Sequence, residues 1–225
     1  MRLATAALPF LAGALICGFV CPARADDLQS WQTLRANVKL SPHITLTNET
    51  IVRSGNQRGF YDLTDNLMLG YAIDSHISAW IGYTHQSIMQ HGSLLAIEHR
   101  LRPQLSFDSI ARIGPVRIGG RLRLEARWRD NAGGTGWRIR PQVKLTLPLA
   151  SRLSVSLTHE QYFDLNRTPF QTVGGLERTR SALVLSTALS KHVGIDFGYL
   201  EQHGFLRGRP DTNDHVATIA LTGSF

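Results

Sequence analysis

Arginine and glutamate recur at every second position in several segments of this chain. The clearest segment is 116–129, VRIGGRLRLEARWR, in which one parity is apolar and the other carries arginine and glutamate. A guanidinium group stays charged and its planar fork binds carboxylates and other oxyanions in a bidentate manner. The candidate residues for such chemistry are Glu98, Arg100, Arg102, Arg121, Arg123, Glu125, Arg127, Arg138, Arg140, Arg178 and Arg180.

Two interpretations of these charged residues stay open from the sequence. They could form a structural network of salt bridges that fills a narrow interior, where removal of one member would leave a partner unpaired. They could also line a basic interior that binds or passes small anions, because the arginines outnumber the carboxylates near them.

A second kind of chemistry is suggested by His85 and Ser87, which form an H-x-S motif, with Glu98 further along the chain. A histidine can deprotonate a serine if a third group fixes its tautomer. The alternative function is therefore an outer-leaflet lipid hydrolase, resembling a lipid A deacylase or a phospholipase. Ile88 stands where an asparagine usually follows such a serine, and Glu98 has the parity of the arginines, so we expect no enzymatic activity.

Neither a metal nor another cofactor is expected. The histidines are scattered, no H-x-x-x-H spacing or carboxylate cluster occurs, and no glycine-rich loop joins a strand to a helix.

The charged residues must be positioned by strands, because strict alternation places the two parities on opposite faces of a β-strand. Eleven segments alternate in this way, and several exceed the usual length of soluble strands. They are 31–40, 43–53, 60–73, 76–87, 95–107, 116–129, 137–147, 152–163, 177–189, 193–203 and 215–225.

The length of these strands favours a transmembrane barrel over a secreted sandwich, with the apolar parity facing lipid. We predict an all-β antiparallel barrel of roughly 10–12 strands. Short periplasmic turns (41–42, 74–75, 148–151, 190–192) would alternate with longer external loops (54–59, 88–94, 130–136, 164–176, 204–214). The eleven segments that alternate conflict with the even number of strands expected when both termini of a barrel lie in the periplasm.

Aromatic residues near strand ends predict a girdle at the membrane interfaces. They are Trp31, Tyr83, Trp128, Trp137 and Tyr162.

The N-terminus predicts export. Residues 1–25 combine Arg2, an uncharged apolar stretch and the sequence Ala23-Arg24-Ala25, which is typical of a cleaved signal peptide, and residues 26–225 form one domain. Both cysteines lie in the cleaved segment. The formal net charge is +7, but the basic residues alternate along strands rather than cluster, so nucleic acid is not an expected partner.

The motifs also resemble a known family. Glu98 and Arg100 form an E-x-R strand, the segment Arg121 to Arg127 an R-x-R-x-E-x-R strand, and Gly198 to Gln202 a G-Y-L-x-Q strand. These features resemble a bacterial family of outer-membrane β-barrels of unknown function. The resemblance implies the fold and the bacterial outer membrane, but no reaction.

The sequence thus predicts an outer-membrane barrel that is either structural or a narrow, porin-like, anion-preferring channel. The expected partners are outer-membrane lipid, small anions and the barrel-assembly machinery, which would read the terminal Phe225.

Overall fold

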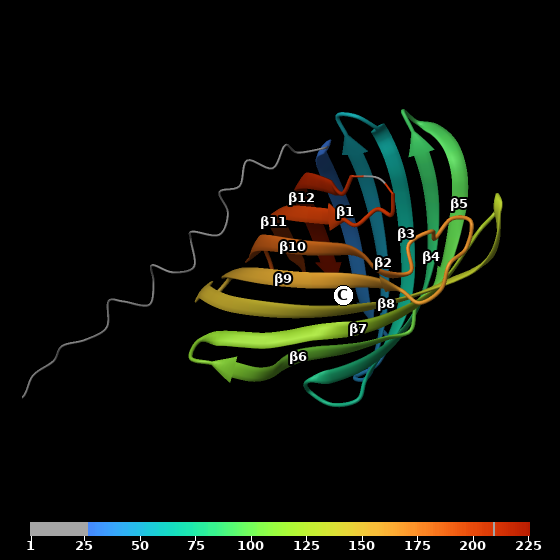
Figure 1. The fold of residues 1–225 in the computed structure, drawn as a ribbon. Helices are drawn as coiled ribbons and strands as arrows, with labels where there is room; N and C mark the ends of the chain where they lie inside the picture. Colours follow the sequence, from blue (N-terminus) through green and yellow to red (C-terminus); the bar gives the residue numbers. More distant parts are fainter. Residues whose placement is uncertain (1–26, 209) are drawn as a thin grey trace, which may run out of the picture.

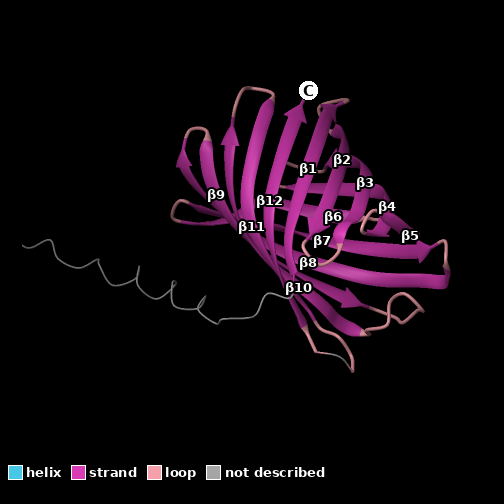
Figure 2. Cartoon of the chain, turned by 90° about the horizontal axis from the view of Figure 1, so that it is seen from above, coloured by secondary structure: helices cyan, strands magenta, loops and turns pink. Residues whose placement is uncertain are grey.

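The structure is a computed structural model that describes residues 27–208 and 210–225. The signal peptide predicted over residues 1–25 lies outside the described residues. The described chain forms strands joined by turns and loops, as Figure 2 shows. The strands are β1 (Asp27–Lys39), β2 (Ile44–Gly55), β3 (Gly59–Ala72), β4 (Ile77–Gln90), β5 (Ser93–Leu101), β6 (Gln104–Ile113), β7 (Val116–Arg129), β8 (Ala132–Ala150), β9 (Leu153–Asp164), β10 (Gly175–Ala188), β11 (Val193–Gly204) and β12 (Thr212–Ser224).

The twelve strands occupy eleven positions in one closed, mostly antiparallel barrel (Figure 1). β5 and β6 lie end to end, because both pair with β4 on one side and with β7 on the other. The interruption falls at Pro103, whose nitrogen cannot donate a hydrogen bond. The all-β barrel of roughly 10–12 strands predicted from the sequence is confirmed, with eleven strand positions.

The expectation of an even number of strands is wrong. β1 pairs with β12 in parallel, from Asp27 opposite Asp214 to Asn37 opposite Ser224. One parallel pair allows an odd number of strands to close into a barrel. As a consequence, β1 begins at one end of the barrel and β12 finishes at the other.

The two ends of the barrel differ in their connections. The end at which β1 begins has the loops 165–174 and 205–211, and we call it the loop end; the opposite end has only short connections and is the turn end. Three of the expected long loops, at 54–59, 88–94 and 130–136, are instead tight turns between extended strands. At the second of these, His91 and Gly92 both have positive φ, as two-residue hairpin turns require.

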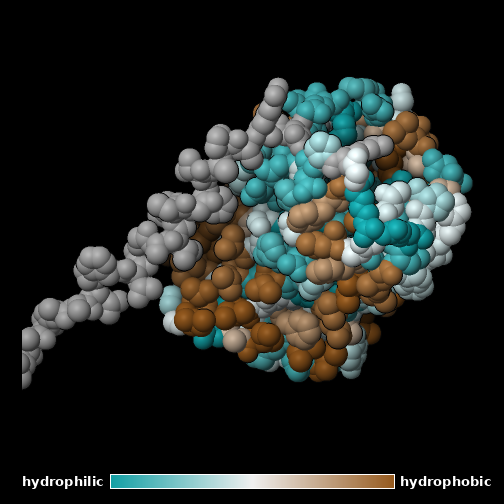
Figure 3. Space-filling view, in the orientation of Figure 1, coloured by the Kyte–Doolittle hydropathy of each residue, from teal (hydrophilic) through white to brown (hydrophobic). Residues whose placement is uncertain are grey.

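The wall has an apolar outer face and a polar inner face. β7 has the bounds predicted from its alternation. Leu122 on its outward parity is 42% exposed, whereas Arg123 on the inward parity is 4% exposed. Figure 3 shows hydrophobic side chains over the lower part of the visible face, where Figure 1 draws β6 to β9.

Hydrophobic side chains are exposed on strands all round the barrel. They include Leu34, Leu67, Leu69, Ile81, Leu101, Leu105, Val143, Leu145, Leu157, Leu183, Leu185, Phe197, Ile219 and Leu221. In the part of the chain that the structure describes, no helix is long and apolar enough to cross a membrane.

The parallel closure predicts a specific cross-linking pattern. Ser30 lies opposite Ala217, and Leu34 opposite Leu221, so the cysteine pairs Ser30→Cys with Ala217→Cys and Leu34→Cys with Leu221→Cys should both form disulfides. Residues 26–225 contain no cysteine of their own. Oxidation of the folded protein followed by non-reducing electrophoresis measures the cross-links.

The control pairs exchange the partners, joining Ser30→Cys with Leu221→Cys and Leu34→Cys with Ala217→Cys. These should not cross-link, because they are four residues out of register. Cross-linking of the control pairs instead of the matched pairs would mean that β1 and β12 run antiparallel.

Candidate functional site

The barrel encloses a cavity of about 1600 Å³ lined mainly by charged and hydroxyl side chains. The basic lining residues are Arg35, Arg53, Arg58, Arg100, Arg102, Arg117, Arg121, Arg123, Arg127, Arg129, Arg138, Arg140, Lys144, Arg178 and Arg180. The acidic lining residues are Asp27, Glu49, Asp62, Asp108, Glu160, Asp164, Glu177 and Asp214. Glu98 and Glu125 are completely buried among the arginines. Basic groups are therefore in excess.

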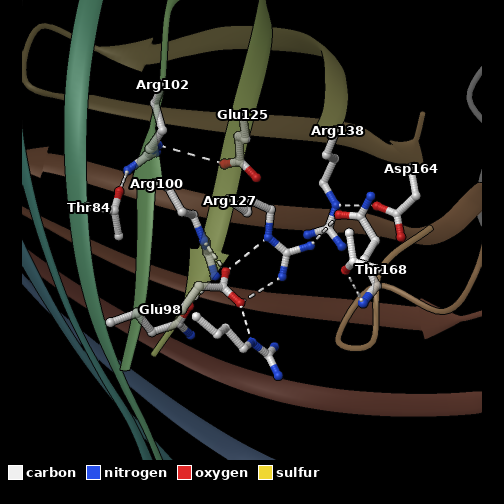
Figure 4. A network of polar contacts seen from close by, with 12 residues as sticks. Thr84, Glu98, Arg100, Arg102, Glu125, Arg127, Arg138, Asp164 and Thr168 are labelled. Carbon is white, nitrogen blue, oxygen red and sulfur yellow. Dashed lines mark hydrogen bonds and ion pairs between the residues drawn. The ribbon is translucent and has the colours of Figure 1, made fainter. Parts of the chain in front are cut away.

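Glu98 is the carboxylate with the most guanidinium partners. It accepts hydrogen bonds from Nε of Arg100 at 2.6 Å, from Nε of Arg129 at 2.7 Å, and from Arg127 through both Nε and Nη2 at 2.9 and 3.0 Å. Figure 4 shows Arg100 of β5 and Arg127 of β7 directed toward the carboxylate of Glu98. The position of Glu98 on the inner face of β5 places it directly opposite Arg129 in the register.

A second cluster is centred on Arg140 of β8. Its guanidinium donates to Glu125 at 2.6 Å, to Glu160 at 2.9 Å and to the hydroxyl of Tyr162 at 2.7 Å. Arg121 donates to the other oxygen of Glu160 at 2.9 Å. These contacts tie β7, β8 and β9 together on the inner side of the wall.

Four other interior carboxylates also have arginine partners. Arg138 bonds Asp164 at 2.7 Å and lies 3.3 Å from Glu177, which also accepts from Arg178 at 2.8 Å. On the opposite wall, Arg35 pairs with Glu49, and Arg53 donates to Asp62 at 3.0 Å.

Four basic residues of the lining lack a carboxylate partner. Among the described residues, no ion pair within 4.0 Å is formed by Arg117, Arg123, Lys144 or Arg180. Lys144 is exposed to the cavity near the turn end, whereas Arg123 is buried at mid-barrel. The unpaired positive charge therefore extends from the turn end to the middle of the cavity.

Arg180 is held by aromatic rings instead of a carboxylate. Its guanidinium carbon lies 4.7 Å from the ring centroid of Trp31 and 4.8 Å from that of Tyr162. Trp31 and Tyr162 are 8% and 2% exposed, so their expected place in an outer aromatic girdle is wrong. Each shares the inward parity of its strand, beside Thr33 and Glu160, and this parity was the signal that places them inside.

The loop 165–174 folds into the interior, which no sequence pattern indicated. Gln171, 2% exposed, accepts a hydrogen bond from Arg127 at 2.9 Å and donates to the carbonyl of Trp137 at 3.0 Å. The guanidinium carbon of Arg129 lies 5.0 Å from the ring centroid of Phe170, and Val173 is buried. The loop thus narrows the cavity beside the Glu98 cluster.

Comparisons with known proteins agree with this architecture. The family described as "Protein of unknown function (DUF2490)" matches residues 28–213. The chain belongs to the DUF2490 family.

This DUF2490 protein also has a curated relative and a structural neighbour. An uncharacterized protein of Methylorubrum extorquens is 23% identical over 158 residues, which cover 68% of each chain. The crystal structure of the NanC porin is similar in fold, with a TM-score of 0.57 and 11% sequence identity, over 88% of this chain and 99% of that one. The likeness shows a porin-like barrel fold.

The structure of this DUF2490 protein places every arginine and glutamate candidate on the inner side of the wall. Glu98, Arg100 and Arg127 share one cluster, and Glu125 and Arg140 share the next. The other candidates, Arg102, Arg121, Arg123, Arg138, Arg178 and Arg180, line the same cavity.

The H-x-S residues are not brought together with Glu98. His85 is exposed on the outer face of β4, next to His99, and Ser87 lies on the same face. Glu98 is on the inner face, saturated by arginines. Among the described residues, no hydrogen bond joins His85 to Ser87, and the wall separates both from Glu98.

No group of three or more histidine, cysteine, aspartate or glutamate side chains in residues 27–208 and 210–225 is arranged to hold a metal ion.

The Glu98 cluster predicts that a single substitution at Glu98 strongly destabilises the folded barrel. Glu98→Gln removes the one negative charge shared by three arginines, so the folded barrel should lose roughly 3–5 kcal/mol of stability. Equilibrium unfolding in urea, followed by heat-modifiable gel migration, measures this loss.

The matched control is Glu201→Gln, which removes the same charge on the outer face of β11, where no ion pair is formed among the described residues. It should change stability by less than about 1 kcal/mol. Equal losses in the two variants would show that Glu98 is not a structural centre.

Proposed function

We propose that this protein is a bacterial outer-membrane β-barrel. The closed wall pairs each strand with a neighbour on both sides, and the exposed leucine, isoleucine and phenylalanine side chains on the outside match a lipid environment. The porin-like fold and the export signal predicted over residues 1–25 support the same location.

We further propose that the interior is a narrow, anion-preferring passage. The excess of basic lining residues, four of them without a carboxylate partner, carries this proposal. Fixed positive charge in a confined cavity with low-dielectric walls raises the local concentration of anions and repels cations. The barrel fold alone would be compatible with the passage of either anions or cations.

The two halves of the interior have different roles: one stabilises the wall, and the other is in contact with the solute. Toward the loop end, the paired charges around Glu98 and Glu125 are buried and hold the wall together. Toward the turn end, the lining includes exposed and half-buried side chains, among them Arg117, Lys144 and Thr158. Anions would enter at the turn end and meet the narrow region next to loop 165–174.

Planar-bilayer recording tests the anion preference. With refolded protein in a KCl gradient, the reversal potential should indicate that chloride permeates better than potassium. The double variant Arg117→Glu with Lys144→Glu should shift the reversal potential toward potassium, because it reverses two cavity charges that no carboxylate neutralises.

Lys191→Glu is the control, because Lys191 is an exposed residue of the connection 189–192 at the turn end and does not line the cavity. It should leave the reversal potential unchanged. An absence of conductance steps would contradict the channel and leave the interior a structural network. A preference for potassium in the unmodified protein would contradict the anion selectivity.

A further inference from the structure

We infer that Arg123, with Arg102 and Arg121, forms a binding site for one small tetrahedral oxyanion, such as inorganic phosphate, at mid-barrel. The inference rests on the proposed function in that the ion must reach the site through the barrel interior. The site differs from the paired clusters because its central guanidinium lacks a carboxylate.

Arg123 is fixed by a single neutral contact. Its Nε donates to Oε1 of Gln104 at 2.7 Å, and the amide nitrogen of Gln104 donates to the hydroxyl of Ser106 at 2.7 Å. Gln104 is thereby oriented, and it accepts only on the Nε side of the guanidinium. Neither Nη atom of Arg123 has a hydrogen-bond partner among the described residues, although Arg123 is only 4% exposed.

The free Nη atoms of Arg123 face the cavity. Arg123 lines the cavity. Its two Nη atoms have no partner, but they are not sealed from solvent, so a solute in the cavity can reach them. A guanidinium edge with two parallel N–H donors is the geometry that binds two oxygens of one oxyanion.

The surrounding charges favour an anion. Arg102, Arg121 and Arg140 are the cations that act most strongly on Arg123. Arg102, Arg121 and Arg140 share two carboxylates, Glu125 and Glu160, in contacts between 2.6 and 3.7 Å, and Arg123 has none.

Glu49 of β2 is the other carboxylate that interacts with Arg102 and Arg123, but its oxygens are taken by Arg35 and Asn66. A bound dianion would therefore compensate charge that the protein leaves unpaired.

The donor set favours a tetrahedral oxyanion over a carboxylate. Arg102 approaches from the β5–β6 junction, and Arg121 and Arg123 come from β7, two residues apart on the inner face. A tetrahedral ion presents oxygens in several directions and can accept from more than one guanidinium. A carboxylate presents only two oxygens, both in one plane, and so offers fewer acceptor directions to guanidinium groups that come from different strands.

Isothermal titration calorimetry of the detergent-folded protein with inorganic phosphate, at constant ionic strength, tests the site. Saturable binding of one phosphate per chain is expected, with acetate binding much more weakly. Arg123→Gln should weaken phosphate binding at least about 10-fold, because charge-assisted hydrogen bonds are lost. Lys191→Gln, which removes an exposed positive charge that does not line the cavity, should leave the affinity within about two-fold.

Arg121→Gln provides a second test if Arg123→Gln does not fold, since Arg121 is only half-buried; it should weaken phosphate binding several-fold. Equal affinity in the folded Arg123→Gln or Arg121→Gln variant, equally tight binding of acetate, or no saturable phosphate binding would overturn the site. Phosphate binding without conductance would contradict the channel but support the site. Anion-selective conductance without phosphate binding would support the channel and contradict the site.

Discussion

An ionised side chain held away from bulk water needs a partner, and this constraint determines how the interior of the barrel is built. Glu98 and Glu125 are completely buried, and each lies within ion-pair distance of more than one arginine. Because those arginines come from β5, the β5–β6 junction, β7 and β8, satisfying the carboxylates also fixes how the strands lie against one another. The charged interior is thus part of the support of the wall.

The same constraint distinguishes the two ends of the cavity. Where carboxylates are available, the side chains pack tightly and loop 165–174 adds Gln171 to the network. Where they are lacking, at Arg117, Arg123 and Lys144, positive charge faces open space. A protein that needed only a filled interior could pair or remove these charges, so their presence is the physical basis for assigning anions to the cavity.

Much of this arrangement follows from period-two alternation. The bounds of β7, the inward arginines and the outward leucines were all predictable, because a strand has two faces and the residue types separate cleanly between them. Trp31 and Tyr162 had the inward parity too, but an expectation based on residue type placed them outside. Parity was the better guide.

Alternation carries no information on strand partners or chain reversals. The parallel pairing of β1 with β12 depends on closure of the whole wall, and His91-Gly92 turns tightly through backbone angles that do not appear in the polarity pattern. Loop 165–174 has no period, and its inward fold depends on contacts such as Arg127 with Gln171 that form only once the barrel exists.

In the proposed membrane barrel, one wall separates lipid from a charged, water-accessible interior. Ala182 and Leu183 are adjacent on β10; Ala182 lines the cavity, and Leu183 is 54% exposed on the outside. Spin labels at the two positions in lipid vesicles, examined by electron paramagnetic resonance with oxygen and a water-soluble nickel chelate, test this directly. The label at 183 should be relaxed mainly by oxygen and that at 182 mainly by the nickel chelate. Equal accessibility at the two positions, or the reverse pattern, would contradict the account.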